Sequence, residues 1–83
     1  SENVEEYIQI YPNPGEDFIN IDCGIHDQKE IRISDAAGRV IYVLNSFEGN
    51  KLSLDVSSWL NGVYFITVSS DKSVSSSKMV ISH

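Results

Sequence analysis

The stretch KEIRISDAAGRVIYVLN, residues 29–45, decides the fold class of this chain. Its first part, Lys29–Ser34, places isoleucines on one face and an arginine on the other, which is the period of a strand with one buried face. The next four residues, Asp-Ala-Ala-Gly at 35–38, predict a type I turn closed by a glycine at positive φ. The return segment, Arg39–Asn45, is apolar on both faces, which predicts a central strand. The stretch therefore predicts an antiparallel β-hairpin.

The same pattern of strands and turns continues on both sides of this hairpin. Polar residues and glycines separate the apolar segments at intervals of roughly 8–12 residues, and no helical period is present. The spacing predicts an all-β fold, an antiparallel seven-stranded β-sandwich that is immunoglobulin-like in size and strand count. The other strands are predicted at Tyr7–Tyr11, Phe18–Cys23, Leu52–Val56, Val63–Ser69 and Val74–Ile81.

Length and charge exclude several classes of function. The 83 residues suffice for one domain with one core. The net charge of −6 disfavours nucleic acid and anionic membrane surfaces as partners, because both attract clustered Lys and Arg. No apolar run is long enough to insert across a bilayer. Because the chain starts at Ser1 without a methionine, we expect a piece of a longer protein, with residues 1–6 as a linker remnant and residues 7–83 as the domain.

A search for catalytic and metal-binding residues gives no convincing constellation. The candidate general bases are His26, in a loop, and His83, the last residue, and no Gly-x-Ser-x-Gly elbow accompanies them. Glu16, Asp17 and Asp22 offer oxygen ligands without the spacing of a calcium loop. The sequence therefore predicts a protein that is not an enzyme and holds no metal or cofactor.

The aromatic residues and the lone cysteine are predicted to belong mainly to the core. Tyr11, Tyr42, Trp59 and Tyr64 are the candidates for a sugar-stacking face. Tyr64, however, lies in an alternating strand, which predicts a buried ring with a hydrogen-bonded hydroxyl, and Trp59 is placed to cap one end of the sandwich. Cys23 follows an alternating strand and is predicted to be buried and inert.

Four short motifs occur in order along most of the chain. They are Tyr-Pro-Asn-Pro at Tyr11–Pro14, Asp-Ala-Ala-Gly-Arg at Asp35–Arg39, Leu-Asn-Gly-Val-Tyr at Leu60–Tyr64, and Lys-Met-Val-Ile at Lys78–Ile81. In order and spacing they resemble the C-terminal sorting domains of proteins exported by the bacterial type IX secretion system, and the resemblance covers about residues 11–81. Two positions depart from the family pattern: Trp59 stands where leucine is more frequent, and the chain ends on His83 in place of a basic residue.

The resemblance implies an export signal. A domain of this type lies at the C-terminus of a cargo protein, which reaches the periplasm and then passes the type IX outer-membrane translocon to the cell surface or the medium. A sortase-like cysteine peptidase then removes the domain, so the chain is that enzyme's substrate. The alternative is a non-catalytic β-sandwich accessory domain that binds a carbohydrate or a protein at the cell surface, which an exposed aromatic patch would favour.

The same motifs suggest a recognition surface. Prolines at 12 and 14 predict a stiff, unpaired corner, and Val74–Ile81 is predicted to be an edge strand to which a partner strand can add. Alternatively, Gly38 serves only the turn and the motif tyrosines only the core. The residues predicted to be recognised by the translocon are Tyr11, Pro12, Asn13, Pro14, Gly38, Arg39, Lys78, Met79, Val80 and Ile81.

Overall fold

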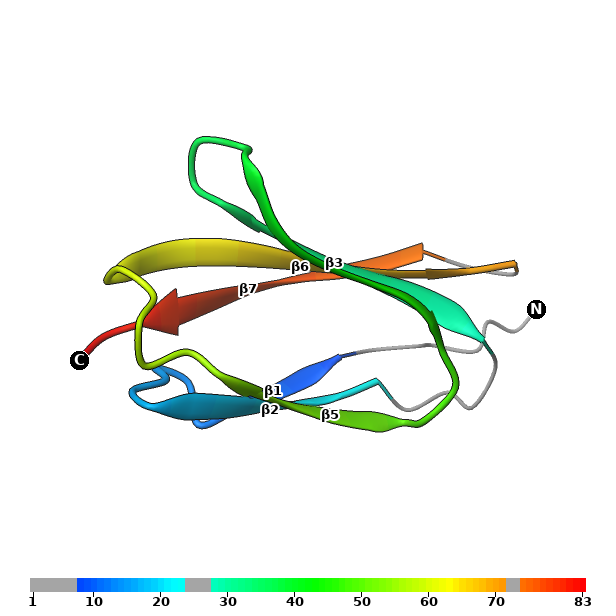
Figure 1. The fold of residues 1–83 in the computed structure, drawn as a ribbon, viewed down its shortest axis with the longest axis horizontal. Coiled ribbons are helices and arrows are strands. Elements are labelled where there is room, and N and C mark those ends of the chain that lie inside the picture. Colours follow the sequence, from blue (N-terminus) through cyan, green and yellow to red (C-terminus); the bar gives the residue numbers. More distant parts are fainter. Residues whose placement is uncertain (1–7, 24–27, 72–73) are drawn as a thin grey trace.

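The structure, a computed structural model, describes residues 8–23, 28–71 and 74–83. These residues form two antiparallel sheets that pack face to face, with no helix among them (Figure 1). Strand order is β1-β2-β5 in the three-stranded sheet and β4-β3-β6-β7 in the four-stranded sheet. The predicted all-β, seven-stranded sandwich is therefore confirmed. The strands are β1 Gln9–Tyr11, β2 Phe18–Asp22, β3 Lys29–Asp35, β4 Val40–Phe47, β5 Lys51–Asp55, β6 Gly62–Ser70 and β7 Val74–Ile81.

The predicted strands differ from the observed ones by at most two residues at each described end. The last strand, Val74–Ile81, coincides with β7. At the other end of the chain, Ile8 precedes β1, while Tyr7 and the predicted linker at 1–6 lie outside the described residues. The alternation of apolar and polar residues fixed these boundaries, because a strand must keep the same face buried along its length.

The core lies between the two sheets and is built from alternate residues of β2, β3, β6 and β7. Isoleucines dominate it, as expected for half-buried pleated strands. Cys23 is only 2% exposed, and burial raises the pKa of its thiol, which confirms the predicted buried cysteine. The buried apolar residues are Ile19, Ile21, Cys23, Ile31, Ile33, Val56, Tyr64, Ile66, Val68, Met79 and Ile81.

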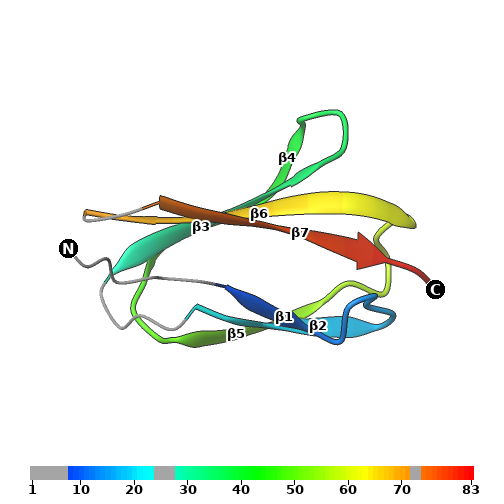
Figure 2. The ribbon, with the colours of Figure 1, turned by 180° about the vertical axis from the view of Figure 1, so that it is seen from behind.

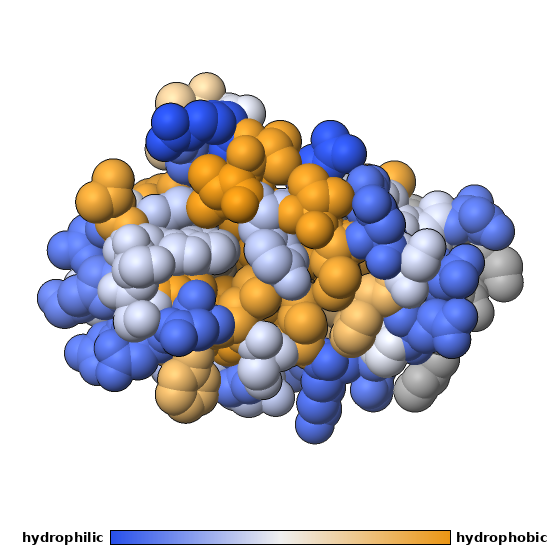
Figure 3. Space-filling model, viewed as in Figure 1, coloured by the Kyte–Doolittle hydropathy of each residue, from blue (hydrophilic) through white to orange (hydrophobic). Residues whose placement is uncertain are grey.

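The prediction of a central position for the strand after the hairpin turn is wrong. β4 pairs only with β3 and forms one edge of the four-stranded sheet. Half of its apolar residues pack against the core, but Val40, Ile41 and Val43 remain 44%, 38% and 43% exposed. Figure 3 shows this apolar surface along β4 and around the base of the β3–β4 hairpin. In β4, apolar residues on both faces therefore accompany an exposed edge position and not a central one.

The sandwich is elongated, with principal extents of 40 × 22 × 22 Å. β4 and β5 lie on the side seen in Figure 1, and β1 and β7 lie on the side seen in Figure 2. Within the described residues, no helix is long and apolar enough to cross a membrane. The turns and corners lie at the two ends of the long axis of the sandwich, and one of these ends carries the four sequence motifs.

Candidate recognition site

All four motifs lie at one end of the sandwich, which we call the signature end (residues 11–15, 35–39, 59–64 and 78–83). The corner after β1, the β3–β4 turn, the β5–β6 loop and the end of β7 lie at this end, and the β3–β4 turn projects on the side away from the corner (Figures 1 and 2). Hydrogen bonds between distant segments hold this end together: Asn13 Oδ1 accepts from the Val80 N–H, and Asn61 Oδ1 accepts from the His83 N–H. The motifs are thus far apart in sequence and adjacent in space.

The corner after β1 is joined to the last strand. The Gly15 N–H donates to the Val80 carbonyl at 2.9 Å, and the Ser82 N–H donates to the Gly15 carbonyl at 2.8 Å, which forms a parallel bridge with Ile81. Together with the 3.1 Å bond from the Val80 N–H to Asn13 Oδ1, these contacts define the junction, residues 13–15 and 80–82. The backbone of Pro12–Pro14 has no strand pairing, as predicted, and the pairing with β7 begins at Gly15, the residue that follows the corner. Both X-Pro bonds of the corner, Tyr11-Pro12 and Asn13-Pro14, are cis.

Gly15 is required at the junction because of the space around it. A Cβ atom at this position would overlap Ile19 Cγ2 and approach Ile81 Cδ1 to 3.4 Å. Gly15 is buried between the two sheets, so nothing there can move without displacing core isoleucines. The glycine thus permits the corner to contact β7 closely enough for backbone hydrogen bonds.

The structure separates the predicted recognition residues into exposed and buried ones. Tyr11, Pro12, Asn13 and Pro14 are exposed at the corner. On the last strand Lys78 is exposed and Val80 is half-buried, whereas the side chains of Met79 and Ile81 are both 1% exposed and belong to the core. Met79 and Ile81 can therefore affect recognition only indirectly, by keeping β7 folded.

The position of β7 at the edge of the four-stranded sheet is confirmed. Because Val80 directs its N–H and carbonyl to the junction, the backbone groups of Lys78, Ser76 and Val74 face the same way, away from β6. The end of this edge at Val80 is covered by the junction, so a partner strand could pair only with the part from Val74 to Lys78.

Asp35 organises the β3–β4 turn. Its Oδ1 accepts hydrogen bonds from the backbone N–H groups of Ala37 (3.0 Å) and Arg39 (2.9 Å), and its Oδ2 pairs with Arg39 Nε at 3.1 Å. Gly38 donates its N–H to the Asp35 carbonyl and has a φ of 90°, which confirms the predicted turn closed by a glycine. No atom lies within 4 Å of a Cβ built on Gly38, so backbone conformation alone selects glycine there. The turn presents the Arg39 side chain, 75% exposed, to solvent.

The charge of Asp35 should make the turn sensitive to acid. The pKa of Asp35 is lowered from its ordinary value of 3.8, first by the N–H of Arg39 and further by that of Ala37 and by the guanidinium of Arg39. A lowered folded-state pKa means that this stabilisation is complete above the unfolded-state pKa and is lost as pH falls through the folded-state value. We expect Asp35→Asn, which keeps an acceptor oxygen but no charge, to be less stable than the native chain at pH 7.

Urea denaturation at pH 7 and at pH 3 measures this effect. The difference in unfolding free energy between the native chain and Asp35→Asn should narrow at pH 3, because this pH lies below the ordinary pKa of 3.8 and part of the stabilisation by the charge is lost there. Asp71→Asn, at an exposed aspartate outside the turn, is the control and should show a smaller gap at pH 7. An equal gap for Asp35→Asn at both pH values would show that the charge does not stabilise the turn.

A cleft of about 400 Å³ lies between this turn and the β5–β6 loop. Trp59 and Tyr64 form one wall, with ring centroids 5.3 Å apart, and the Tyr64 hydroxyl donates to the Leu60 carbonyl at 2.6 Å. This confirms the predicted buried tyrosine with a bonded hydroxyl and the predicted capping role of Trp59, which packs against the core. Leu60, by contrast, is 77% exposed at the rim. The second and third motifs thus form one apolar cleft.

A comparison with protein families decides the assignment. The family model described as "Secretion system C-terminal sorting domain" matches residues 9–82, nearly the whole chain. The chain belongs to this family, the C-terminal sorting domains of type IX secretion. Among curated proteins no significant match was found. A type IX sorting signal implies a cargo in the same polypeptide, interaction with the secretion system, and export to the cell surface or the extracellular space.

In this sorting domain the aromatic residues do not form a sugar-stacking face, in agreement with the core role predicted for Trp59 and Tyr64. Tyr64 is buried, Trp59 and Tyr42 are half-buried against the core, and only Tyr11 of the four candidates is exposed. The ring nitrogen Nε2 of His83 lies 2.7 Å from the Trp59 carbonyl, so this histidine joins the last residue to the β5–β6 loop. His26, the other candidate base, lies outside the described residues.

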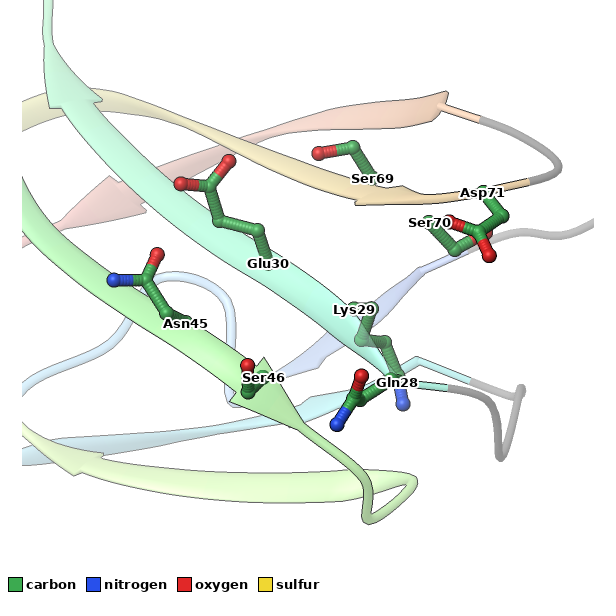
Figure 4. A pocket seen from close by; sticks show the side chains of 8 residues that line it. All are labelled: Gln28, Lys29, Glu30, Asn45, Ser46, Ser69, Ser70 and Asp71. Carbon is green, nitrogen blue, oxygen red and sulfur yellow. The ribbon is translucent and has the colours of Figure 1, made fainter.

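A second hollow, of about 530 Å³, lies at the opposite end of the four-stranded sheet (Figure 4). Within the described part of the sorting domain, no group of three or more His, Cys, Asp or Glu residues is placed to hold a metal ion. The Nζ of Lys29 does not serve a ligand there, because it donates to the carbonyls of Gly49 at 2.7 Å and Phe47 at 3.4 Å. The lining residues are Gln28, Lys29, Glu30, Asn45, Ser46, Ser69, Ser70 and Asp71, all polar.

Two residues of the signature end were missed by sequence reasoning. Gly15 was treated only as the residue that releases the corner, and Asn61 only as part of a turn. The Asn61-Gly62 pair is a turn signal, but the partner of its side chain, the N–H of His83, is 22 residues away. Neither contact has a local sequence signal, since both join segments that meet only in the folded sandwich.

Proposed function

We propose that this domain directs an attached cargo protein from the periplasm through the type IX outer-membrane translocon. A sortase-like cysteine peptidase then cleaves the chain upstream of the sandwich and releases the domain from the cargo. The observation that supports this function is the family match over residues 9–82 together with the meeting of all four motifs at one end of the molecule. The domain itself is proposed to carry out no chemistry.

The orientation of the strands supports recognition at the signature end. β1 runs toward this end, so its amino-terminal side, where a cargo would be joined, points the other way. A cargo attached upstream therefore leaves the signature end free. We assign direct contact with the translocon to the exposed motif residues Tyr11, Pro12, Asn13, Pro14, Arg39 and Lys78, and a shaping role to Gly38, Met79, Val80 and Ile81.

Export of a reporter tests this function. A fluorescent protein with an ordinary signal peptide and this chain at its C-terminus is expressed in a type IX-competent cell and in a translocon-deficient one. We expect reporter outside the first cell and reporter trapped in the periplasm of the second. Retention of a folded fusion in both cells would contradict the proposed function, and a fusion that lacks residues 9–82 controls for nonspecific leakage.

A further inference from the structure

The sandwich has four edge strands, and three of them are protected against pairing with another chain. β1 has only three residues and is followed by Pro12, and β5 carries the exposed charges of Lys51 and Asp55. β7 carries Lys78 in its middle and is covered by the junction at its end. Short length, charge, proline, β-bulges and covering segments are the usual means by which natural sheets protect their edges.

Of these protections β4 has only the irregular pairing on either side of its middle part. Between Val40 and Phe47 the sequence VIYVLNSF contains no charge and no proline, and its three exposed apolar residues include Ile41 and Val43. The register of β4 to β3 shifts between Val40 and Tyr42 and again between Leu44 and Phe47, and Ser46 has a φ of 59°. The regular part of this edge is therefore Tyr42–Leu44, which is uncharged and apolar.

The backbone of β4 also offers free pairing directions. Asp35 donates its N–H to the Arg39 carbonyl, so the backbone groups of Asp35, and of every second residue before it in β3, face β4. Arg32 is out of phase with this set and faces β6. Val43, which lies opposite Arg32, consequently directs its own N–H and carbonyl away from β3, toward solvent.

We propose that an extended segment of the secretion machinery, apolar in its middle and charged at its ends, adds to β4 as an antiparallel strand. This inference rests on the proposed function and names the contact by which the domain is held. The edge is flanked by Arg39 at its start and Glu48 at its end. An antiparallel strand complements these charges when it carries a basic residue at its amino-terminal end and an acidic residue at its carboxyl-terminal end.

The cleft at the signature end extends this contact. Ile41 of β4 also lines the cleft, together with Trp59 and Leu60. A strand that runs along β4 toward Arg39 reaches the cleft at its carboxyl-terminal end, where an apolar side chain can be buried. Main-chain pairing along β4 then supplies affinity, and the cleft supplies specificity, as in other cases of strand addition.

A second copy of this chain fits the edge less well. Eight residues span about 27 Å, and at a sheet thickness of roughly 10 Å the pairing of two β4 strands buries only about 540 Å² in total. Stable specific interfaces bury roughly 1,200–2,000 Å². Each copy also carries a net charge of −6, which opposes association. A longer partner that fills the adjoining cleft as well is therefore the better occupant.

The test compares two prolines placed at matched edges in the reporter fusion. Val43→Pro removes an N–H that faces solvent from β4, and Ser76→Pro does the same on β7, so both leave the ladders within the sheet intact. We expect Val43→Pro to lower the exported fraction about tenfold or more, because partner strand pairing is lost. Export of Ser76→Pro should stay near the native level.

The outcomes separate this inference from the proposed function. Native export with undiminished export of Val43→Pro, or loss of export confined to Ser76→Pro, would overturn strand addition at β4 while leaving the export function in place. Retention of the native fusion in both cells would contradict the function itself. Circular dichroism melts of the purified domain check folding, and if Val43→Pro does not fold, Val43→Lys with Val74→Lys as its control decides by the same readout.

Discussion

Substituting Ile81 by alanine is expected to cost the domain about 2–5 kcal/mol of unfolding free energy. Ile81 is 1% exposed, lies in the last strand and packs where a Cβ on Gly15 would reach its Cδ1. Its truncation leaves a cavity beside Ile19 and the junction. The surrounding residues cannot fill this cavity unless both sheets move. For a domain of 83 residues such a loss is a large part of the total stability.

Urea denaturation of the purified domain measures this change, and the reporter fusion measures its consequence for export. Lys78→Ala is the matched control on the same strand, since its side chain is exposed and its removal should alter stability by no more than about 0.5 kcal/mol. Full stability of Ile81→Ala would show that β7 does not close the core. The comparison of Ile81→Ala with Lys78→Ala also shows why deletion of residues 78–83 is a poor test of recognition. The deletion removes Met79 and Ile81 from the core along with any recognition surface.

Lys29→Ala is expected to be the most damaging substitution among the charged residues. Lys29 is 3% exposed, and its ammonium group donates to the carbonyls of Gly49 and Phe47 and lies 5.2 Å from the centroid of the Phe47 ring. Without it the carbonyls of the β4–β5 connection lose a charged donor, and the aliphatic stem leaves a gap. Hydrogen bonds to charged groups contribute roughly 1.5–3 kcal/mol each, so we expect a loss of about 2–3 kcal/mol.

The control for this prediction is Lys51→Ala on β5, where the side chain is exposed. Denaturation curves of both variants and of the native chain give the comparison directly. Equal stability of the two variants would mean that the buried ammonium contributes no more than a surface charge. A lower denaturant midpoint confined to Lys29→Ala supports its role as a clamp on the β4–β5 connection.

The sequence contained enough information for the fold class and the strand boundaries. Period-two alternation identified the strands, and the Asp-x-x-Gly turn identified the hairpin, because both depend on neighbouring residues only. The burial of Lys29 was not predicted, although alternation places this residue on the same face as Ile31. Strand order was not readable: an apolar run such as that in β4 does not reveal whether one neighbour or two flank it.

The candidate site was only partly predictable for the same reason. The four motifs named the segments that gather at the signature end, but their contacts depend on tertiary structure. Nothing near Asn13 in sequence indicates that its side chain would accept the N–H of Val80, and nothing near Gly15 indicates Ile19 and Ile81 as its neighbours. The exposed edge at β4, which carries the further inference, was hidden by the assignment of that strand to the middle of its sheet.

The junction also affects how fast this domain folds. The hydrogen bond between Asn13 and Val80 spans 67 residues, most of the chain, and β7 supplies Met79 and Ile81 to the core. Contacts of such long sequence separation slow folding, because the entropy of loop closure is lost before the contacts form. The corner can acquire its partner only after the last strand has been synthesised and docked. A chain that lacks the last strand would therefore carry three of the four motifs and still lack the complete recognition site.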